Sequence, residues 1–337
     1  MTQNSKTTKV IRFDAAGGPE VLKLEEIPLP ELAADEVRIR IAALGLNRAD
    51  SMFRRNQYVL EPSFPGSRIG TDAAGVVEAV GAEVTALKVG DRVTAGLGFD
   101  VSRYGTHGET ALLPAGFAIG YPDFLSPEEA ASINIPYVTA WGALVDQGAL
   151  AEGDFVLVTA ASSGVGIAAV QIAKAVGAIP IAVTRRREKR PRLFEAGAAH
   201  VVVTEEEDLA RRVLEITGGR GVRIVFDAVF GGMPETLVEV TAPGGTIFFY
   251  GALDQEKPAV LPMFPTMMKE IRFQGYVVYS VFGDPERLAR ALRFIYDGFE
   301  SGRLKVVVDR SFPLAEYREA HRRLESNEQI GRIVVTV

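Results

Sequence analysis

The sequence contains no cysteine, and this absence excludes several kinds of chemistry. Without thiols the chain cannot form disulfides, use a thiolate nucleophile or bind a cysteine-ligated zinc. Histidine is scarce as well, since His107, His200 and His321 are the only three. A catalytic zinc takes three protein ligands of imidazole, thiolate or carboxylate type, so the sequence offers little from which to build such a site.

Long apolar runs and an excess of basic charge are also missing. No stretch approaches the roughly 18 uncharged apolar residues of a membrane span, and MTQNSKTTKV at the N-terminus has no apolar signal core. The formal net charge is −6, whereas binding to nucleic acid or anionic membrane requires an excess of lysine and arginine. We therefore expect a cytoplasmic protein that binds neither nucleic acid nor membrane.

Length and local patterns predict two domains in these 337 residues. Up to about residue 130, short alternating or apolar runs are separated by Gly, Pro and Asp turns, which is typical of a β-rich domain. From residue 153 the pattern becomes strand then helix, repeated, which predicts a doubly wound α/β domain. We expect the chain to return to the first domain, which gives residues 1–135 with 283–337, and residues 136–282.

The stretch VLVTAASSGVGIAAVQ, residues 156–171, begins as an apolar strand and ends as an apolar helix. Two glycines mark the turn between them, and such a turn directs unpaired helix N-terminal amides at one point. A pyrophosphate bound there gains hydrogen bonds and the favourable helix dipole. A tight turn without a ligand is the alternative. The residues predicted to bind the cofactor are Ala161, Ser162, Ser163, Gly164, Val165 and Gly166.

The end of the second predicted strand of this domain carries basic rather than acidic residues. An NAD-dependent enzyme presents Asp or Glu there to the ribose 2′-hydroxyl, whereas this sequence reads TRRREK over residues 184–189. Arginine pairs with a 2′-phosphate, which a carboxylate would repel. We therefore predict NADPH, although the same run is compatible with a solvated start of a helix. The residues predicted to bind here are Thr184, Arg185, Arg186 and Lys189.

Two further strands end in loops that point to the same edge of the predicted sheet. Ligands of open α/β sheets bind beyond the carboxyl ends of the strands, which selects the loops after RIVFD and after TIFF. We expect these loops to border the nicotinamide, while ordinary strand-end loops remain the alternative. The residues selected are Val229, Tyr250, Gly251 and Leu253.

Four segments together resemble the medium-chain dehydrogenase/reductase superfamily. In order they are AALGLNRADSMFRRNQY, PGSRIGTDAAGVVEAVGAEVTALKVGDRV, AASSGVG and FPLAEYREAHRRLESNEQIGRIVV. Within the superfamily they are similar to the zinc-independent quinone oxidoreductase branch, which is related to ζ-crystallin. The resemblance implies an α/β fold with a GroES-like β-rich domain, a doubly wound parallel Rossmann sheet, a cofactor in the cleft and a homodimer.

The departures from this superfamily concern the metal. Its zinc alcohol dehydrogenases have Cys where Asn47 stands, His where Thr71 stands and another Cys near Ile135. All three ligands are therefore missing, and we expect no metal. Asp72 occupies the place of an acidic residue near the zinc, and we expect it to be structural. His107 is expected on the surface or in a turn rather than as a base.

An enzyme without a Lewis acid favours acceptors that delocalise the incoming negative charge by themselves. Quinones and α,β-unsaturated carbonyls meet this condition, and hydride passes directly from C4 of the nicotinamide once the two rings are in contact. By resemblance, Asn47 lies near the nicotinamide ribose and Tyr58 lies at the mouth of the active site. Asn47 is also able to cap a turn, Tyr58 to pack in the core, and solvent to supply the proton.

Two other functions remain open on the sequence alone. One is an enoyl-thioester reductase, which requires a larger basic groove for a CoA or carrier phosphopantetheine. The other is an NADPH-binding sensor or structural protein with little turnover. We expect a homodimer through IRFQGYVVYS, residues 271–280, because an apolar last strand would otherwise leave a bare sheet edge.

Overall fold

The computed structural model describes residues 7–337 and separates the chain into two compact units. Unit 1 contains Met1–Asn134 and Val308–Val337, and unit 2 contains Ile135–Val307. The first boundary lies within one residue of the predicted one. The return to unit 1 comes at Val308, later than the predicted residue 283.

Helix α11 (Pro285–Glu300) explains why unit 2 extends beyond residue 283. Its apolar face includes Ile295, which is fully buried. Arg287 and Arg290 of the same helix each bind a different carboxylate oxygen of Asp146, at 2.7 and 2.8 Å. The helix is therefore fastened to unit 2 by both packing and charge.

Unit 2 is built on one six-stranded parallel sheet of order β11-β10-β9-β12-β13-β14. Along the chain this is the order 3-2-1-4-5-6, which reverses direction between β9 and β12. The strands are β9 (Phe155–Val158), β10 (Ile179–Thr184), β11 (His200–Val203), β12 (Val222–Asp227), β13 (Thr241–Phe249) and β14 (Arg272–Gly275). The helices are α4 (Asn134–Trp141), α5 (Gly164–Ala175), α6 (Arg190–Glu195), α7 (Leu209–Ile216), α8 (Pro234–Val240), α9 (Met263–Met268), α10 (Tyr279–Phe282) and α11.

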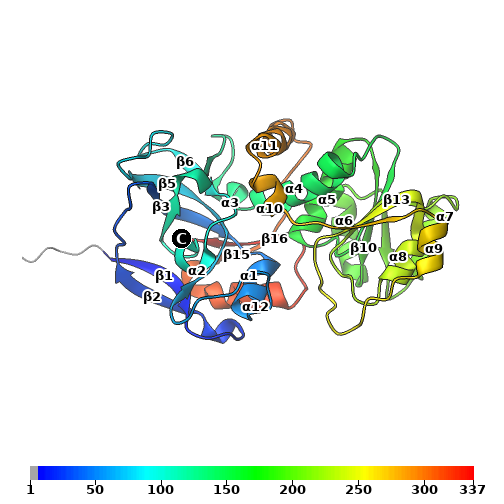
Figure 1. Ribbon diagram of the computed structural model, residues 1–337, viewed down its shortest axis with the longest axis horizontal. Coiled ribbons are helices and arrows are strands. Elements are labelled where there is room, and N and C mark those ends of the chain that lie inside the picture. The colour runs from blue at the N-terminus through cyan, green and yellow to red at the C-terminus, as the bar shows by residue number, and fades with distance from the viewer. Residues whose placement is uncertain (1–6) are drawn as a thin grey trace, which may run out of the picture. The chain divides into compact units, whose positions relative to one another are not determined.

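Both faces of this sheet are covered, as the apolar strands predict. Successive residues of a strand point to opposite faces, and in β9 the consecutive Val156, Leu157 and Val158 are all fully buried. Helix α5 packs against β9 and β10, while α7 packs against β11 and α8 (Figure 1). The predicted doubly wound α/β domain is therefore confirmed.

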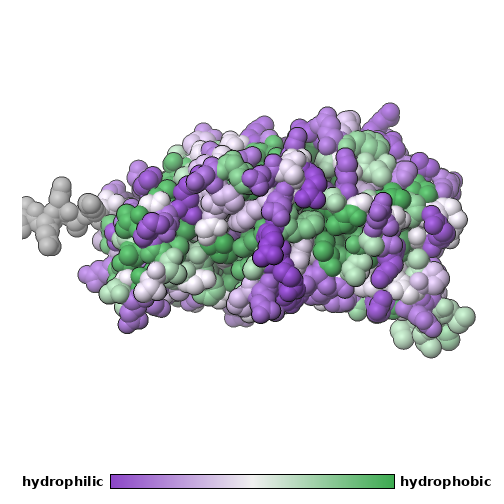
Figure 2. Space-filling view, turned by 90° about the horizontal axis from the view of Figure 1, so that it is seen from above, coloured by the Kyte–Doolittle hydropathy of each residue, from purple (hydrophilic) through white to green (hydrophobic). Residues whose placement is uncertain are grey.

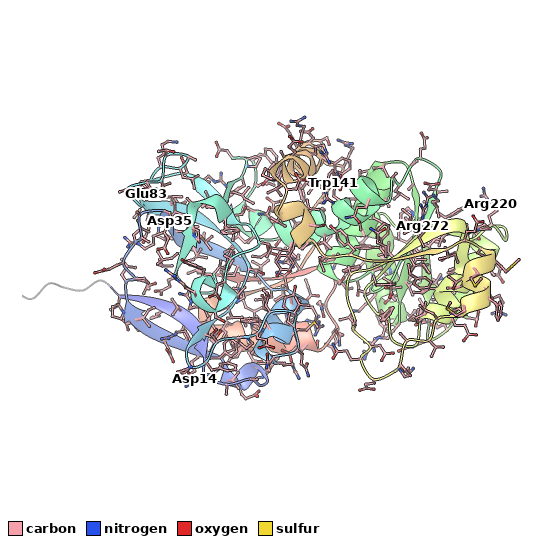
Figure 3. All side chains as sticks on the ribbon, viewed as in Figure 1. Asp14, Asp35, Glu83, Trp141, Arg220 and Arg272 are labelled. Carbon is pink, nitrogen blue, oxygen red and sulfur yellow. The ribbon has the colours of Figure 1, made fainter. Side chains whose placement is uncertain are left out.

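The predicted strand 271–280 is shorter in the structure. Only Arg272–Gly275 pairs with β13, and the chain then turns into α10 (Tyr279–Phe282). Strand β14 is nevertheless the outer strand of the sheet, with Arg272 on it labelled in Figure 3. One side of this strand has no partner strand in unit 2.

Exposed apolar side chains gather in the same part of the chain. Figure 2 shows a surface that is mostly hydrophilic, with hydrophobic side chains in smaller patches. In α9, Phe264 is 80% exposed and Met268 is 84% exposed, and Val277 just after β14 is 57% exposed. Within residues 7–337, none of the helices has the length and apolarity needed to span a bilayer.

Unit 1 is β-rich, as predicted. One of its sheets has the order β15-β16-β3-β5-β6-β8 with β7 also paired to β3, and a three-stranded sheet has the order β2-β1-β4. The strands are β1 (Thr7–Phe13), β2 (Lys23–Pro28), β3 (Glu36–Gly45), β4 (Ser67–Arg68), β5 (Asp72–Val80), β6 (Arg92–Ala95), β7 (Thr110–Pro114), β8 (Ala118–Gly120), β15 (Val308–Pro313) and β16 (Arg332–Thr336). The helices are α1 (Arg48–Arg54), α2 (Val101–Tyr104), α3 (Pro127–Ala130) and α12 (Tyr317–Glu325).

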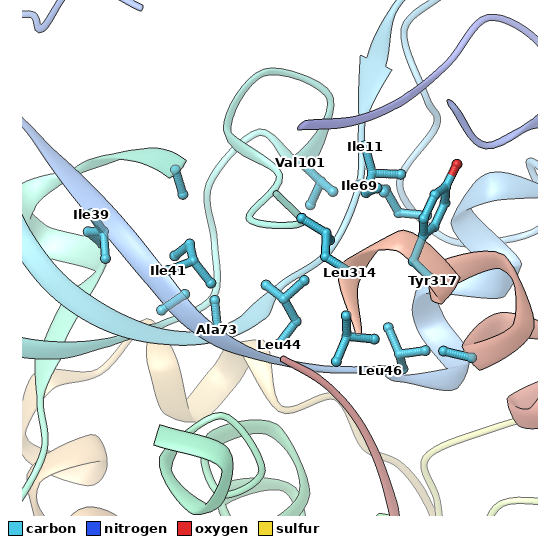
Figure 4. Packing of buried hydrophobic residues seen from close by; sticks show 14 of the residues in the cluster. Ile11, Ile39, Ile41, Leu44, Leu46, Ile69, Ala73, Val101, Leu314 and Tyr317 are labelled. Atoms are coloured by element: carbon cyan, nitrogen blue, oxygen red, sulfur yellow. The ribbon is translucent and has the colours of Figure 1, made fainter. Parts of the chain in front are cut away.

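Alternation along β3 builds the core of unit 1. Val37, Ile39 and Ile41 are at most 3% exposed, whereas Arg38 and Arg40 between them reach solvent. This period of two is that of a strand with one face on a core. The buried side chains join others from β1, β5 and the segment after β15 in one cluster, part of which Figure 4 shows.

Two histidines of unit 1 are buried near each other. A surface position for His107 is wrong, because the side chain is 2% exposed and its ring packs on Gly70, where a Cβ atom would come within 2.0 Å of it. The ring of His321 in α12 lies 6.2 Å from that of His107. Arg54 Nη1 is 3.2 Å from His321 Nδ1, and because a guanidinium only donates, this nitrogen must accept. His321 is therefore neutral.

This burial predicts a loss of stability in mild acid. Burial lowers the pKa of His107 to about 3 and holds the pKa of His321 well below its usual value. The unfolded chain takes up protons below about pH 6.5 while the folded chain does not, so the free energy of unfolding falls as pH falls. Each histidine contributes a slope of at most about 1.4 kcal/mol per pH unit.

The measurement is urea unfolding between pH 7.5 and 5 of the wild type and of His107→Gln. Asp50, whose pKa burial raises to about 7, acts in the opposite direction in both proteins, so the difference between the two slopes reports the histidine. We expect the variant to have the flatter dependence on acid. His200→Gln, at a partly buried position, is the control and should change the slope less. Equal slopes for all three proteins would contradict the prediction.

Candidate functional site

The turn between β9 and α5 forms the N-terminal end of a twelve-residue helix. Ser163 caps this helix, because its Oγ accepts a hydrogen bond from the amide of Gly166 at 3.0 Å. The amide of Ile167 donates to the carbonyl of Ser163 at 2.9 Å. The amides of Gly164 and Val165, at the first two helical positions, have no carbonyl one turn earlier in the helix and are available to an anion.

Gly166 is required by the tightness of this turn. A Cβ atom there would lie 2.5 Å from the carbonyl oxygen of Ala160 and 2.6 Å from Cα of Ala161, both of which are backbone atoms. Ala160 itself has a φ of 45°, in the left-handed region that non-glycine residues seldom adopt. The close approach keeps the loop tight against the first turn of the helix. This is the backbone arrangement that a pyrophosphate needs.

A buried lysine joins this loop to the end of β10. Lys189 is 9% exposed, and its Nζ donates to Oγ of Ser162 at 3.0 Å. Thr184, the last residue of β10, is buried at 7% exposure. The structure therefore brings together the two groups of predicted cofactor-binding residues, those of the loop and those of the basic run.

The arginines of the basic run are placed differently from Lys189. Arg185 and Arg186 are exposed, and within residues 7–337 they form no ion pair. Arg187 lies 3.8 Å from Glu206, so its charge is partly matched. Two guanidinium groups just after the end of β10 thus remain available to an anionic ligand.

The strands on either side of the reversal are tied together at their carboxyl ends. Asp227 at the end of β12 is fully buried and accepts from Oγ1 of Thr159, which follows β9, at 2.5 Å. The same carboxylate accepts from the amides of Val229 and Phe230 at 3.2 and 2.7 Å. Burial raises the pKa of Asp227, and these hydrogen bonds act against that rise. The result is a fixed turn at the place where open α/β sheets bind their ligands.

The loop after β13 closes over this turn. The amide of Leu253 donates to the carbonyl of Ala228 at 3.0 Å, and a Cβ atom on Gly251 would lie 3.0 Å from that same oxygen. The ring of Tyr250 stacks on Phe226 at 4.0 Å, and its buried hydroxyl lies next to the side chain of Ser163, the cap of α5. Burial raises the pKa of Tyr250 well above its usual value, so the hydroxyl stays a donor. Tyr250 therefore joins the loop after β13 to the first turn of α5.

In unit 1, Asn47 belongs to a buried cluster with Asp72 and Arg332, all at most 6% exposed. Arg332 Nη1 donates to Asn47 Oδ1 at 2.7 Å, and Arg332 Nη2 donates to Asp72 Oδ2 at 2.7 Å. Asn47 Nδ2 donates to the same carboxylate oxygen at 3.0 Å. Asp72 thus anchors both neighbours.

The strand register explains why these residues meet. Gly45 at the end of β3 is paired with Val334 of β16 on one side and with Asp72 of β5 on the other. Arg332 and Asp72 therefore approach the end of β3 from its two neighbouring strands. A Cβ atom on Gly45 would lie 2.3 Å from Arg332 Nη2, so glycine leaves the room through which the guanidinium passes.

Asp50 adds a second buried carboxyl to this cluster. It lies at the third position of α1, and its Oδ2 accepts from the amide of Asn47 at 2.7 Å. Burial raises the pKa of Asp50 to about 7 and Asp72 pushes it further in that direction, while Arg332 and Arg54 lower it. The cluster therefore contains a carboxyl group whose protonation changes near neutral pH.

The structure offers no metal site in the part of the chain that it describes. No group of three His, Cys, Asp or Glu residues there is arranged to hold an ion. The hydroxyl of Thr71 is buried and has no hydrogen-bond partner among residues 7–337, and Ile135 has no donor atom in its side chain. Tyr58 is partly buried and packs against the core of unit 1.

Sequence reasoning missed Arg332 and the tie between Thr159 and Asp227. The only signal for Arg332 is a single charged residue at the start of an apolar strand, IVV. Thr159 lies just before the recognised glycine-rich motif, and its hydroxyl gains a role only once β12 lies beside β9. In both cases the partner is far away in the sequence.

Comparisons with known proteins agree with this architecture. Residues 33–123 match the sequence model of the alcohol dehydrogenase GroES-like domain, and residues 164–297 match that of the zinc-binding dehydrogenases. The crystal structure of Escherichia coli quinone oxidoreductase complexed with NADPH superposes with a TM-score of 0.88 at 29% identity. That alignment covers 98% of this chain and 100% of the other.

Two relatives differ in how much of their own length this chain covers. A component of the phenolphthiocerol/phthiocerol polyketide synthase of Mycobacterium tuberculosis is 31% identical over 99% of this chain, but the chain spans only 15% of that protein's length. Quinone oxidoreductase of Pseudomonas aeruginosa is 32% identical over 97% of this chain and 99% of its own length. By sequence, domain models and fold, the chain belongs to the quinone oxidoreductase branch of the medium-chain dehydrogenase/reductase superfamily.

Proposed function

We propose that this protein is an NADPH-dependent reductase that transfers hydride to quinones or α,β-unsaturated carbonyls without a catalytic metal. The observation that carries the proposal is the contact of Lys189 with Ser162, beside the unpaired Arg185 and Arg186. Three cationic side chains next to a helix N-terminus match a dinucleotide with an additional 2′-phosphate. The quinone oxidoreductase of E. coli, a structural neighbour, was crystallised with NADPH.

The residues of unit 2 fit this cofactor. The amides of Gly164 and Val165 would hold the pyrophosphate, and the tight approach at Gly166 leaves the space that it needs. Lys189 would bind the 2′-phosphate together with the two arginines. The loops that carry Val229, Tyr250, Gly251 and Leu253 would border the nicotinamide half.

The chemistry divides between the cofactor and the chain. Bound NADPH supplies a hydride from C4 of its nicotinamide ring. Asn47 would contact the nicotinamide ribose or the acceptor, and Tyr58 at the mouth of the site would donate a hydrogen bond to the reduced oxygen. Solvent is an equally good source of the proton, because the product oxygen is strongly basic while it forms. One quinone, one NADPH and one proton then give hydroquinone and NADP⁺.

A quinone or enone is the acceptor class that suits a site without metal ligands. Asn47, Thr71 and Ile135 provide no thiolate or imidazole, so no Lewis acid is available to stabilise an alkoxide. Similarity to a polyketide synthase keeps an enoyl thioester as the second candidate acceptor. A cytoplasmic location remains a prediction from composition.

A homodimer is part of the same proposal. The outer edge of β14 lacks a partner strand, and the exposed apolar side chains of α9 and Val277 lie in neighbouring parts of the chain. Pairing of two copies across a two-fold axis covers such an edge and removes apolar surface from water.

Replacement of both Arg185 and Arg186 by alanine should weaken NADPH binding and leave NADH binding nearly unchanged. A charge-assisted contact contributes roughly 1.5–3 kcal/mol, so each lost contact weakens NADPH binding by about 10- to 160-fold. Fluorescence titration with both cofactors measures the effect. Arg192→Ala is the matched control, because this exposed arginine pairs with Glu195 and lies outside the predicted phosphate site. Equal affinity of the unmodified protein for NADPH and NADH would refute the cofactor assignment.

Quinone reduction should survive exhaustive chelation, and the purified protein should contain no stoichiometric zinc. Oxidation of primary and secondary alcohols by the chelated protein with NADP⁺ should be negligible, because no metal and no evident base is present to remove the hydroxyl proton. Both reactions are followed by NADPH absorbance, and crotonyl-CoA is tested as a second acceptor. Loss of quinone reduction on chelation, with recovery on addition of zinc, would contradict the proposal. Preferential turnover of crotonyl-CoA would instead support an enoyl-thioester reductase.

Light scattering at micromolar concentration should give the mass of a dimer. Val277→Lys should shift the population toward monomer, because it puts a charge into the expected interface. Val89→Lys is the control, since Val89 is similarly exposed, at 61%, but lies in unit 1. A monomer in the wild type, unaffected by either substitution, would rule out this interface.

A further inference from the structure

Arg332 lies next to Asn47, but the proposed reaction assigns it no role. It is 5% exposed, and it divides its two terminal nitrogens between an amide oxygen and a carboxylate oxygen, at 2.7 Å each. A single guanidinium therefore binds Asn47 and Asp72 at the same time and fixes their relative positions. The planar fork of arginine is suited to this, because its donors have fixed mutual angles.

The first effect of this contact is to fix which way the amide of Asn47 faces. Arg332 has only donors, so it requires the Oδ1 side of Asn47, and ionised Asp72 has only acceptors, so it requires the Nδ2 side. Flipping the amide would set donor against donor and acceptor against acceptor. One hydrogen of Nδ2 is engaged by Asp72, and the second is the only remaining donor of the side chain.

The second effect is electrostatic. Asp72 is 2% exposed, and a buried carboxylate is costly unless a cation neutralises it. Arg332 supplies that cation at 2.7 Å. Asp50 lies close enough to both for their charges to act on its carboxyl in opposite directions. The net charge around Asn47 therefore depends on Arg332.

We propose that Arg332 is a positioning residue of the reductase: it locks Asn47 so that the amide presents an N–H donor to the bound ligand, and it neutralises Asp72. The ligand group recognised in this way is an acceptor oxygen, a carbonyl or a ribose hydroxyl. This inference rests on the proposed role of Asn47. In this proposal, Arg332 organises the part of the fold in which the zinc enzymes of the superfamily hold their metal.

Three substitutions separate orientation from charge. Arg332→Gln removes both, Arg332→Lys keeps the charge but loses the fork, and Arg332→Gln combined with Asp72→Asn removes the charges of both partners. Arg323→Gln is the control, because Arg323 also forms a two-pronged pair inside unit 1, with Asp309 at 3.0 and 3.2 Å, away from Asn47. Asn47→Ala tests the proposed function itself. Circular dichroism and NADPH titration establish that each variant is folded and binds cofactor.

The readouts are kcat and KM for a small quinone at several pH values. We expect Arg332→Gln to lower kcat by roughly 10- to 100-fold, as for a misplaced contact group, with little change in the KM for NADPH. Its kcat should fall further as pH rises, because Asp72 without its cation becomes charged. The double variant should lack the part of the pH dependence that Asp72 causes and keep that of Asp50, but stay slow. Arg332→Lys should also lack the part that Asp72 causes and should recover part of kcat. Arg323→Gln should keep the wild-type kcat.

The outcomes distinguish a failure of the proposed site from a failure of the proposed role of Arg332. If Asn47→Ala reduces quinone as fast as the wild type, the proposed site is wrong. If Asn47→Ala is slow while Arg332→Gln keeps its kcat, the site stands and the role of Arg332 is overturned. Should Arg332→Gln fail to fold, the double variant decides, because residue 72 carries no charge in it: a wild-type kcat there overturns the inference, and a low kcat supports it.

Discussion

A charge buried in protein has to be neutralised close to where it lies, and unit 1 is arranged around this constraint. Arg332 and Asp72 neutralise each other between strands β16 and β5. Arg54, which is fully buried, binds Glu325, and His321 next to it is kept neutral. The buried polar groups therefore fix how helices α1 and α12 and the ends of three strands meet.

Unit 2 meets the same constraint without a buried cation beside its acid. Asp227 is held by a threonine hydroxyl and two amides, which suffices to fix a turn but leaves no positive charge there. The cations stand instead at the end of β10, where Arg185 and Arg186 have no ion-pair partner among residues 7–337. Internal pairing thus makes the Asn47 cluster rigid, while the lack of such pairing leaves the end of β10 open to an anionic ligand.

The sequence was sufficient where the signal is local. The AASSGVG turn, the alternating strands of unit 1 and the basic run each involve residues that are near neighbours, so periodicity and turn chemistry predict them. The position of Arg332 depends on β16 pairing with β3, and the burial of His107 depends on its contact with Gly70; neither pairing has a local signature. The end of strand β14 at Gly275 was missed for the opposite reason, since the apolar residues after it continue a strand pattern while the chain turns into α10.

The insertion of Ile135–Val307 between two parts of unit 1 has a consequence for synthesis on the ribosome. Asn47 and Asp72 emerge early, but the strand that carries Arg332 is made only after all of unit 2. Until then Asp72 is without its cation, and the polar cluster cannot close in its final form. We therefore expect unit 2 to acquire its fold first, so that a nascent chain holds the dinucleotide-binding loop before it holds a finished Asn47 cluster.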